Sequence, residues 1–203
     1  MKLKNTTAGP LAGESGQRPC TAFAGARRIA SGDLKDVALK AKRVVDRGGP
    51  APVLIFDDAS GEVIEVDFRG TAAEVLGRLS EPAPRGPGRP RLGVVAREVT
   101  LLPRHWDWLG SQPGGASVAL RKLVEEARRA HAVKDHVRLA QNAAYRFMTT
   151  MAGDAPGFEE ALRALFAGRL DDFERRIAAW PAGVRDQAKK LAAGAFRREA
   201  ATR

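Results

Sequence analysis

The first third of the chain alternates strand and helix patterns of hydrophobic residues. Segment 34–45 carries apolar side chains at helical spacing, with Asp33 placed to cap its start and Gly48 to end it. Thr71 and Glu74 have the spacing of a capping box, which predicts a second, short helix. Short apolar runs bounded by turn residues predict four strands, at 21–25, 28–31, 52–56 and 62–68, the last two joined as a hairpin. We therefore expect a small α+β domain over residues 20–80.

Beyond residue 93 the pattern becomes one strand followed by helices. Residues 94–102 are predicted to form a strand, and Pro103 suits the first turn of a helix over 103–112. A second helix is expected over 117–131, after a glycine turn. Residues 132–203 repeat apolar side chains at helical spacing between turn signals, which predicts about four more helices. We therefore expect a strand–helix–turn–helix segment over 94–131 and an all-helical C-terminal region over 132–203.

A Pro/Gly-rich basic linker separates these parts at residues 81–93. Four Pro and three Gly fall within the fourteen residues 80–93, which excludes a helix or a central strand and favours a stiff, extended chain. The first 19 residues, with scattered Gly, Pro and polar side chains, are expected to be a disordered leader. The predicted fold class is therefore α+β, with a small N-terminal domain, this linker and a helical remainder.

The charge of the chain is unevenly distributed. Its 203 residues carry a net charge of +10, which favours a phosphate-rich partner, nucleic acid first and an anionic membrane surface second. Residues 20–80 hold nine basic and nine acidic side chains, whereas residues 84–97 hold four Arg and no acid. The basic excess thus lies downstream of residue 80, in and beyond the linker.

Cysteine usage and hydropathy indicate the compartment. Cys20 is the single cysteine, which excludes an intrachain disulfide and fits a reducing cytosol. Residues 5–20 contain no apolar signal-peptide region, and no run approaches the ~20 apolar residues of a membrane span. We expect a cytoplasmic protein with no membrane partner.

The strand–helix–turn–helix segment carries a recognisable motif. A strand ends in Leu102-Pro103, a first helix and a glycine turn follow, and the second helix contains Ala-Leu-Arg-Lys-Leu-Val at 119–124. In these features the segment resembles the ribbon-helix-helix family of DNA-binding proteins. There two chains pair their strands into an antiparallel ribbon that enters the major groove. The resemblance implies a homodimer that binds double-stranded DNA.

The side chains that would face the bases depend on the strand register. Alternation places either Arg97, Val99 and Leu101 or Glu98 and Thr100 on the base-facing side, and a slip of one residue exchanges the two sets. Neither set is wholly polar. Arg97 and Thr100 are the candidate DNA contacts, and the sequence does not choose between the registers.

The start of the second helix is a candidate phosphate site. Ser117 can cap this helix, and Gly114, Gly115 and Ala116 let backbone amides approach an anion at its positive end. In the resembled family this corner clamps a phosphate. The alternative is a plain turn between two helices with a good cap. Trp106 and Trp108 are expected in the core or in a dimer interface rather than stacked on bases.

The linker contains a second candidate DNA contact. Gly88, Arg89, Pro90 and Arg91 match the Gly-Arg-Pro centre of an AT-hook, which lies in the minor groove of A·T-rich DNA. Glycine permits deep approach, proline keeps the chain extended, and arginine seeks the negative potential of the narrow groove. The sequence departs from the AT-hook at residue 87, a proline, with Arg85 displaced upstream. A plain solvated linker is the competing interpretation.

Catalytic or metal chemistry has less support. Glu65 and Asp67 alternate with apolar residues and so are expected on a solvated strand face, and Asp58 suits a hairpin turn. The three histidines share no metal-ligand spacing with Cys20, and no P-loop, nucleophile elbow or dinucleotide fingerprint is present. We expect no enzymatic activity, no metal and no cofactor.

Several longer motifs together resemble one bacterial family. They are Thr-Ala-Phe-Ala-Gly at 21–25, Leu-Ile-Phe-Asp-Asp at 54–58, the run from Gly86 to Trp106, Gln-Pro-Gly-Gly-Ala-Ser at 112–117, and Ala-Tyr-Arg-Phe-Met at 144–148. Over residues 20–195 the chain is similar to the family of unknown function DUF2239. That resemblance implies no activity, substrate or catalytic residue.

The local motifs lead to one hypothesis and one rival. The first is a dimeric DNA-binding protein, either a transcriptional regulator or a nucleoid-associated protein, with contacts from Arg85, Arg89, Arg91, Arg97, Thr100 and Ser117. The rival is a non-catalytic interaction module that dimerises through the same segment without binding DNA. The apolar Val99 and Leu101 favour the rival.

Overall fold

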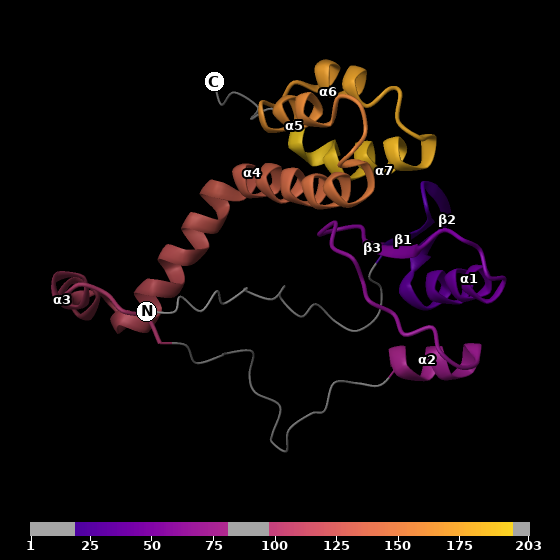
Figure 1. The fold of residues 1–203 in the computed structure, drawn as a ribbon. Coiled ribbons are helices and arrows are strands. Elements are labelled where there is room, and N and C mark those ends of the chain that lie inside the picture. Colours follow the sequence, from indigo (N-terminus) through magenta and orange to yellow (C-terminus); the bar gives the residue numbers. More distant parts are fainter. Residues whose placement is uncertain (1–18, 81–97, 197–203) are drawn as a thin grey trace, which may run out of the picture.

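The computed structural model describes residues 19–80 and 98–196 and shows a mixed, mostly helical α+β fold. In these residues it contains a three-stranded sheet, seven α-helices and a terminal 3₁₀ turn (Figure 1). The elements in chain order are β1 (Pro19–Ala24), β2 (Arg27–Asp33), α1 (Leu34–Asp46), β3 (Val53–Asp57), α2 (Ala72–Ser80), α3 (Pro103–Ser111), α4 (Gly115–Ala152), α5 (Phe158–Phe166), α6 (Leu170–Arg176), α7 (Ala182–Ala192) and η1 (Ala193–Phe196).

The sheet is antiparallel with the order β2-β1-β3, so the first strand is central. β1 and β2 form a tight hairpin at Gly25, whose φ of +53° is accessible to glycine at no steric cost. β3 returns to the other edge of β1 after α1. The three strands begin and end within two residues of the predicted positions, and the largest differences are at the start of β1 and the end of β2.

α1 covers one face of the sheet. Asp33 caps it as predicted, because its carboxylate accepts a hydrogen bond of 2.9 Å from the amide of Lys35. The buried side of α1 packs against the strand residues that point to the same face. The cluster comprises Cys20, Ala22, Ala30, Val37, Ala38, Ala41 and Ile55, with Ile64, Val66 and Phe68 packed at its edge.

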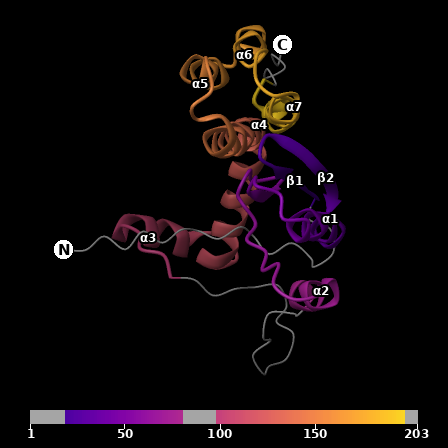
Figure 2. The ribbon, with the colours of Figure 1, turned by 45° about the vertical axis from the view of Figure 1, so that its right-hand side comes forward.

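The second half of α4 and α7 cover the opposite face, and α5 and α6 pack on their outer side (Figures 1 and 2). Phe23 of β1, Phe56 of β3 and Phe147 of α4 are fully buried and meet in edge-on and tilted contacts, with ring centroids 4.9 to 6.0 Å apart. One hydrophobic core therefore includes both the N-terminal sheet and the C-terminal helices. We call the sheet, its covering helices and the second half of α4 the body.

The predicted hairpin after β3 is only partly formed. Ile64 donates a 2.7 Å hydrogen bond to Ile55 and Asp57 a 2.9 Å bond to Glu62, but the pairing is reduced to one bridge between Phe56 and Val63. Residues 65–68 leave the ladder, because Asp67 binds the amide of Arg69 and begins a turn towards α2. The expected strand 62–68 is thus mostly an extended segment.

α4 is a single helix of 38 residues where the sequence pattern suggests two. The stripe over 117–131 and the stripe beginning at Val133 belong to the same helix, because no Pro or Gly interrupts the chain between Ala116 and Ala152. Figure 1 shows that the helix changes direction along its length. Its first half stands away from the body together with α3 (Figures 1 and 2).

Two further expectations concern a strand before α3 and the absence of a membrane span. Residues 98–102 form no strand within the described chain, which is compatible with pairing to a second chain and does not test it. Across residues 19–80 and 98–196, every helix is too short or too polar to cross a membrane.

Candidate nucleic-acid interface

The projecting part of the molecule holds the candidate DNA contacts that the structure describes. We call residues 98–102, α3 and residues 115–134 of α4 the arm. Thr100 lies exposed in the segment before α3, and Ser117 lies exposed in the first turn of α4. Arg85, Arg89, Arg91 and Arg97 lie outside the described residues. The arm therefore brings together two of the six candidate contacts.

α3 packs against the start of α4 around a small apolar hollow. Leu109 is buried between the two helices, as is Ala119 of α4. The hollow has a volume of about 270 Å³ and is lined by Leu101, His105, Trp108, Leu109, Leu120 and Leu123. Pro103 begins α3 as predicted, since the proline needs no amide partner in a first helical turn.

The turn between the two helices depends on glycine. Gly114 and Gly115 have φ values of +87° and +75°, where a side chain would be strained. α4 begins at Gly115 rather than at Ser117, so the expected cap from Ser117 is not formed. The amide of Gly115 donates to the carbonyl of Gln112 at 2.9 Å, which leaves the amides of Ala116 and Ser117 as first-turn donors that no carbonyl of the helix can reach.

Arg121 lies over this helix start and was missed in the sequence motifs. Its Nε donates to the Ser117 carbonyl at 3.1 Å, and its Nη2 lies 3.4 Å from the Ser117 hydroxyl. A cation at the positive end of a helix is electrostatically unfavourable unless an anion is bound there. α3, α4 and α7 have no acidic residue in their first turns, whereas α1, α2, α5 and α6 each have one or two. The amides, the hydroxyl and the guanidinium together suit an anion such as a phosphate.

The rest of the arm is uncovered. All fourteen residues from 121 to 134 are exposed, although Leu123, Val124, Ala127 and Ala130 recur at helical spacing. Isolated helices are marginal in water without packing of an apolar face. This part of α4 therefore has the pattern of a helix that packs against another surface.

A buried polar cluster lies elsewhere, between the sheet and α7. Asp58 is only 4% exposed; its carboxylate accepts hydrogen bonds from Thr21 at 2.8 Å and from Gln187 at 2.7 Å, and it pairs with Lys190 at 2.8 Å. The sequence suggested a turn residue here, but Asp57 fills that role by accepting from the amides of Ala59 and Ser60. Asp58 thus joins residues far apart in the chain, and its partners satisfy the carboxylate.

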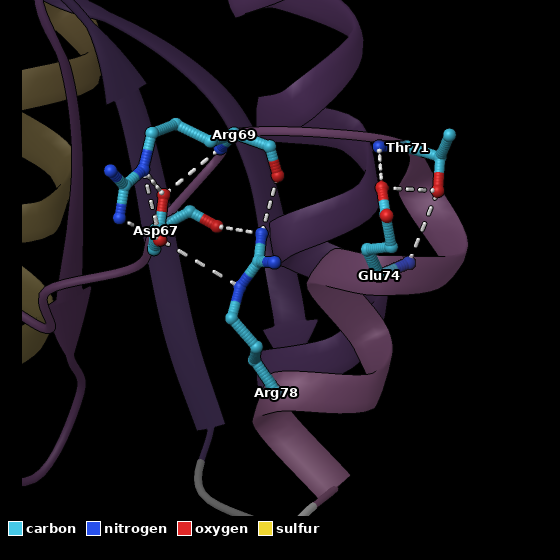
Figure 3. Close-up of polar contacts among 5 residues, drawn as sticks. All are labelled: Asp67, Arg69, Thr71, Glu74 and Arg78. Atoms are coloured by element: carbon cyan, nitrogen blue, oxygen red, sulfur yellow. Dashed lines mark hydrogen bonds and ion pairs between the residues drawn. The ribbon is translucent and has the colours of Figure 1, made fainter.

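A second polar cluster anchors α2 (Figure 3). Arg69 binds both carboxylate oxygens of Asp67, and Arg78 of α2 donates to the main-chain carbonyls of Asp67 and Arg69. The capping box is formed as predicted, because Thr71 donates to Glu74 from its amide and hydroxyl and its hydroxyl accepts from the Glu74 amide. These contacts hold the start of α2 against residues 67–71.

The Cys20 thiol lies close enough to Asp58 to feel its charge. Burial, followed by the charge of Asp58, raises the pKa of the Cys20 thiol to about 12, so the thiol stays protonated and unreactive at neutral pH. Among the described side chains, no three of His, Cys, Asp and Glu are placed to share a metal ion.

Comparison with known proteins gives a family and no functional precedent. A family model described as an uncharacterised protein conserved in bacteria matches residues 19–192, which include the sheet, the arm and α7. No curated protein and no solved structure matches the chain.

Proposed function

This chain belongs to the bacterial family DUF2239, and we propose that it binds double-stranded DNA. In this proposal the protein is a cytoplasmic homodimer and contacts DNA through the arm and the basic linker. The observation that carries the proposal is the start of α4. There, first-turn amides are exposed at the helix start, Arg121 contacts Ser117 in the same turn, and that turn contains no acidic side chain.

The linker adds to this position through its place in the chain. Arg85, Arg89 and Arg91 precede the arm by fewer than twenty residues, so an arm seated on a phosphate keeps these arginines near the same duplex. Arginines next to Gly and Pro suit the minor groove of A·T-rich DNA. Phosphate contacts from α4 and minor-groove contacts from the linker would then act on neighbouring parts of one site.

The hollow favours one of the two registers of the segment before α3. Leu101 lines the hollow, so in an extended chain Thr100 and Glu98 point to the other side. The base-facing set would then contain an acid, Glu98, beside Thr100. A carboxylate disfavours close approach to DNA, which favours contacts to the backbone over base readout. A role in general chromosome binding fits this better than recognition of one operator.

A salt titration of duplex binding tests the proposal. The full-length protein should bind A·T-rich duplex at low salt, with an affinity that falls steeply as salt rises. The logarithm of the association constant falls linearly with the logarithm of the salt concentration. Replacing Arg89 and Arg91 by Ala should make this dependence less steep by up to about 2, since each phosphate contact contributes roughly 0.9. The matched control is Arg163→Ala with Arg175→Ala, which removes the same charge from exposed positions on α5 and α6.

The helix start is tested by a second pair of variants. Arg121→Ala should weaken binding several-fold, because the guanidinium next to Ser117 is lost. Arg128→Ala removes an equally charged side chain two turns further along α4, where it is paired with Glu125, and should leave binding unchanged. Absence of measurable affinity at low salt would refute DNA binding and leave the interaction module, which the exposed apolar side chains of the arm favour.

A further inference from the structure

Helix α3 carries both a half-exposed indole, Trp106, and one wall of the hollow. Trp106 is 44% exposed and does not line the hollow, whereas Trp108 forms part of its wall. The third tryptophan, Trp180, lies in the body and is buried. It is 3% exposed, and its indole N–H donates to the carbonyl of Pro156 at 3.0 Å. An indole left half exposed next to an apolar hollow therefore needs a physical explanation.

The apolar area exposed on the arm is similar to the apolar area that one partner buries in a stable dimer. Val99, Leu102, Trp106, Trp108, Leu123 and Val124 are each 42% to 57% exposed, and all lie on the arm. Half of an indole contributes on the order of 100 Å², so the six side chains expose roughly 400–500 Å². A standard interface buries about 800 Å² per partner, of which a little over half is apolar. The arm thus supplies about the apolar part of one such interface.

We propose that Trp106 of a second copy fills the hollow between α3 and α4, with the reciprocal contact closing a two-fold dimer. Because α3 carries both the exposed indole and part of the wall of the hollow, a two-fold interface can make the same contact twice. The uncovered residues 121–134 of α4 extend from Leu123 of the hollow and would be covered by the same partner. The inference rests on the homodimer of the proposed function and is independent of DNA.

Sedimentation of the full chain without DNA, in 0.5 M salt, tests this contact. The wild-type protein should be a dimer at micromolar concentration, and Trp106→Ala should raise the dimer dissociation constant at least tenfold, as expected when a central aromatic anchor is lost. Leu123→Arg, which places a charge at the wall of the hollow, should give a monomer. Phe166→Ala is the matched control, because Phe166 is an equally exposed aromatic on α5, and its dissociation constant should not change.

A cross-linking measurement identifies the contact itself. The photoreactive amino acid p-benzoylphenylalanine at position 106 keeps an aromatic ring there and should cross-link to residues of the hollow in another copy. A wild-type monomer at 100 µM, an unchanged dissociation constant for Trp106→Ala, or cross-links only within one copy would each overturn the inference. A dimer that responds as expected but binds no duplex would sustain the inference and refute the DNA-binding function.

Discussion

Asp58 forms hydrogen bonds to residues far away in the described chain. Its carboxylate joins Thr21 of the first strand to Gln187 and Lys190 of the last helix, and Thr21 and Gln187 are fully buried. A buried carboxylate is tolerated only when its oxygens are hydrogen-bonded. Here each oxygen has a donor, so the cluster stabilises the contact between β1 and α7.

Loss of the Asp58 carboxylate should be costly. Asp58→Ala leaves the buried donors of Thr21 and Gln187 without their acceptor, and we expect the free energy of unfolding to fall by about 2–4 kcal/mol in urea denaturation. Lys190→Ala should cost no more than about 1 kcal/mol, because the ammonium is 51% exposed and two donors to Asp58 remain. Equal costs for the two variants would show that the ion pair, not the buried hydrogen bonds, stabilises the cluster.

Residues with local partners were predictable from the sequence, and those with distant partners were not. The cap at Asp33 and the capping box of Thr71 and Glu74 follow from spacings of two or three residues. Asp58 meets partners 129 and 132 positions away, which no spacing rule includes. Arg121 was not singled out because its contact with Ser117 depends on where α4 begins. The helix begins at Gly115 and is capped by Gly114, whereas the sequence suggested a cap at Ser117.

At the scale of elements, the turn after β3 is fitted closely to α4. Gly61 has a φ of +70°, and a Cβ built on it would lie 2.0 Å from the carbonyl oxygen of Ala143. Arg146 of α4 donates to the carbonyl of Ser60 at 3.1 Å in the same contact. The sheet and α4 therefore approach each other backbone to backbone at this point.

Gly61→Ala should be markedly more destabilising than a comparable change elsewhere. Gly48 has nearly the same φ, +68°, with open space around it, so Gly48→Ala reports the backbone strain alone, about 1–2 kcal/mol. Gly61→Ala adds the clash with Ala143, and we expect a total loss of about 3 kcal/mol or more by urea denaturation. Similar losses for the two variants would mean that the turn moves away from α4 easily.

The anchor of α2 should respond to acid. Hydrogen bonds from the side chain and the amide of Arg69 hold the pKa of Asp67 well below its usual range. A carboxyl group with a lowered pKa stabilises the fold above its unfolded pKa of about 3.9, and this stabilisation is lost as the pH falls towards the folded value. In an NMR titration the Asp67 carboxyl carbon should have its midpoint well below 3.9, and Arg69→Ala should return the midpoint towards that value.

Element types were predicted better than element ends. Of the four strands expected in residues 20–80, three are present, and the fourth keeps its apolar alternation while pairing only at Val63. Periodicity cannot show that two consecutive helical stripes share one helix, because a change of buried face looks the same as a break. In α4 the face changes because its first half leaves the body.

For the whole molecule, the sheet and the C-terminal helices depend on each other. Phe23 and Phe56 are buried against Phe147, so residues 19–80 alone would expose a large apolar face. We expect this fragment to lack a cooperative urea transition and to give poorly dispersed NMR spectra, whereas the full chain gives one transition for the body. A well-dispersed fragment with a sigmoidal transition would contradict the shared core.

The candidate site was predictable only in outline. Pro103, the glycine turn and the leucine stripe were sufficient to predict the helix pair of the arm, because each signal is local. The hollow and the uncovered face of residues 121–134 could not be predicted, since they depend on what the rest of the chain leaves bare.

Because α4 is one continuous helix, its length and twist determine how the body is placed relative to the arm. A helix of 38 residues has a contour length of about 57 Å, and each inserted residue would move the body by about 1.5 Å and rotate it by about 100° around the axis. If two arms pair, each body is joined to the paired arms by continuous helix rather than by a flexible linker. Insertions in the exposed stretch of α4 would then reorient the bodies periodically, so that activities requiring both would recover only near whole helical turns.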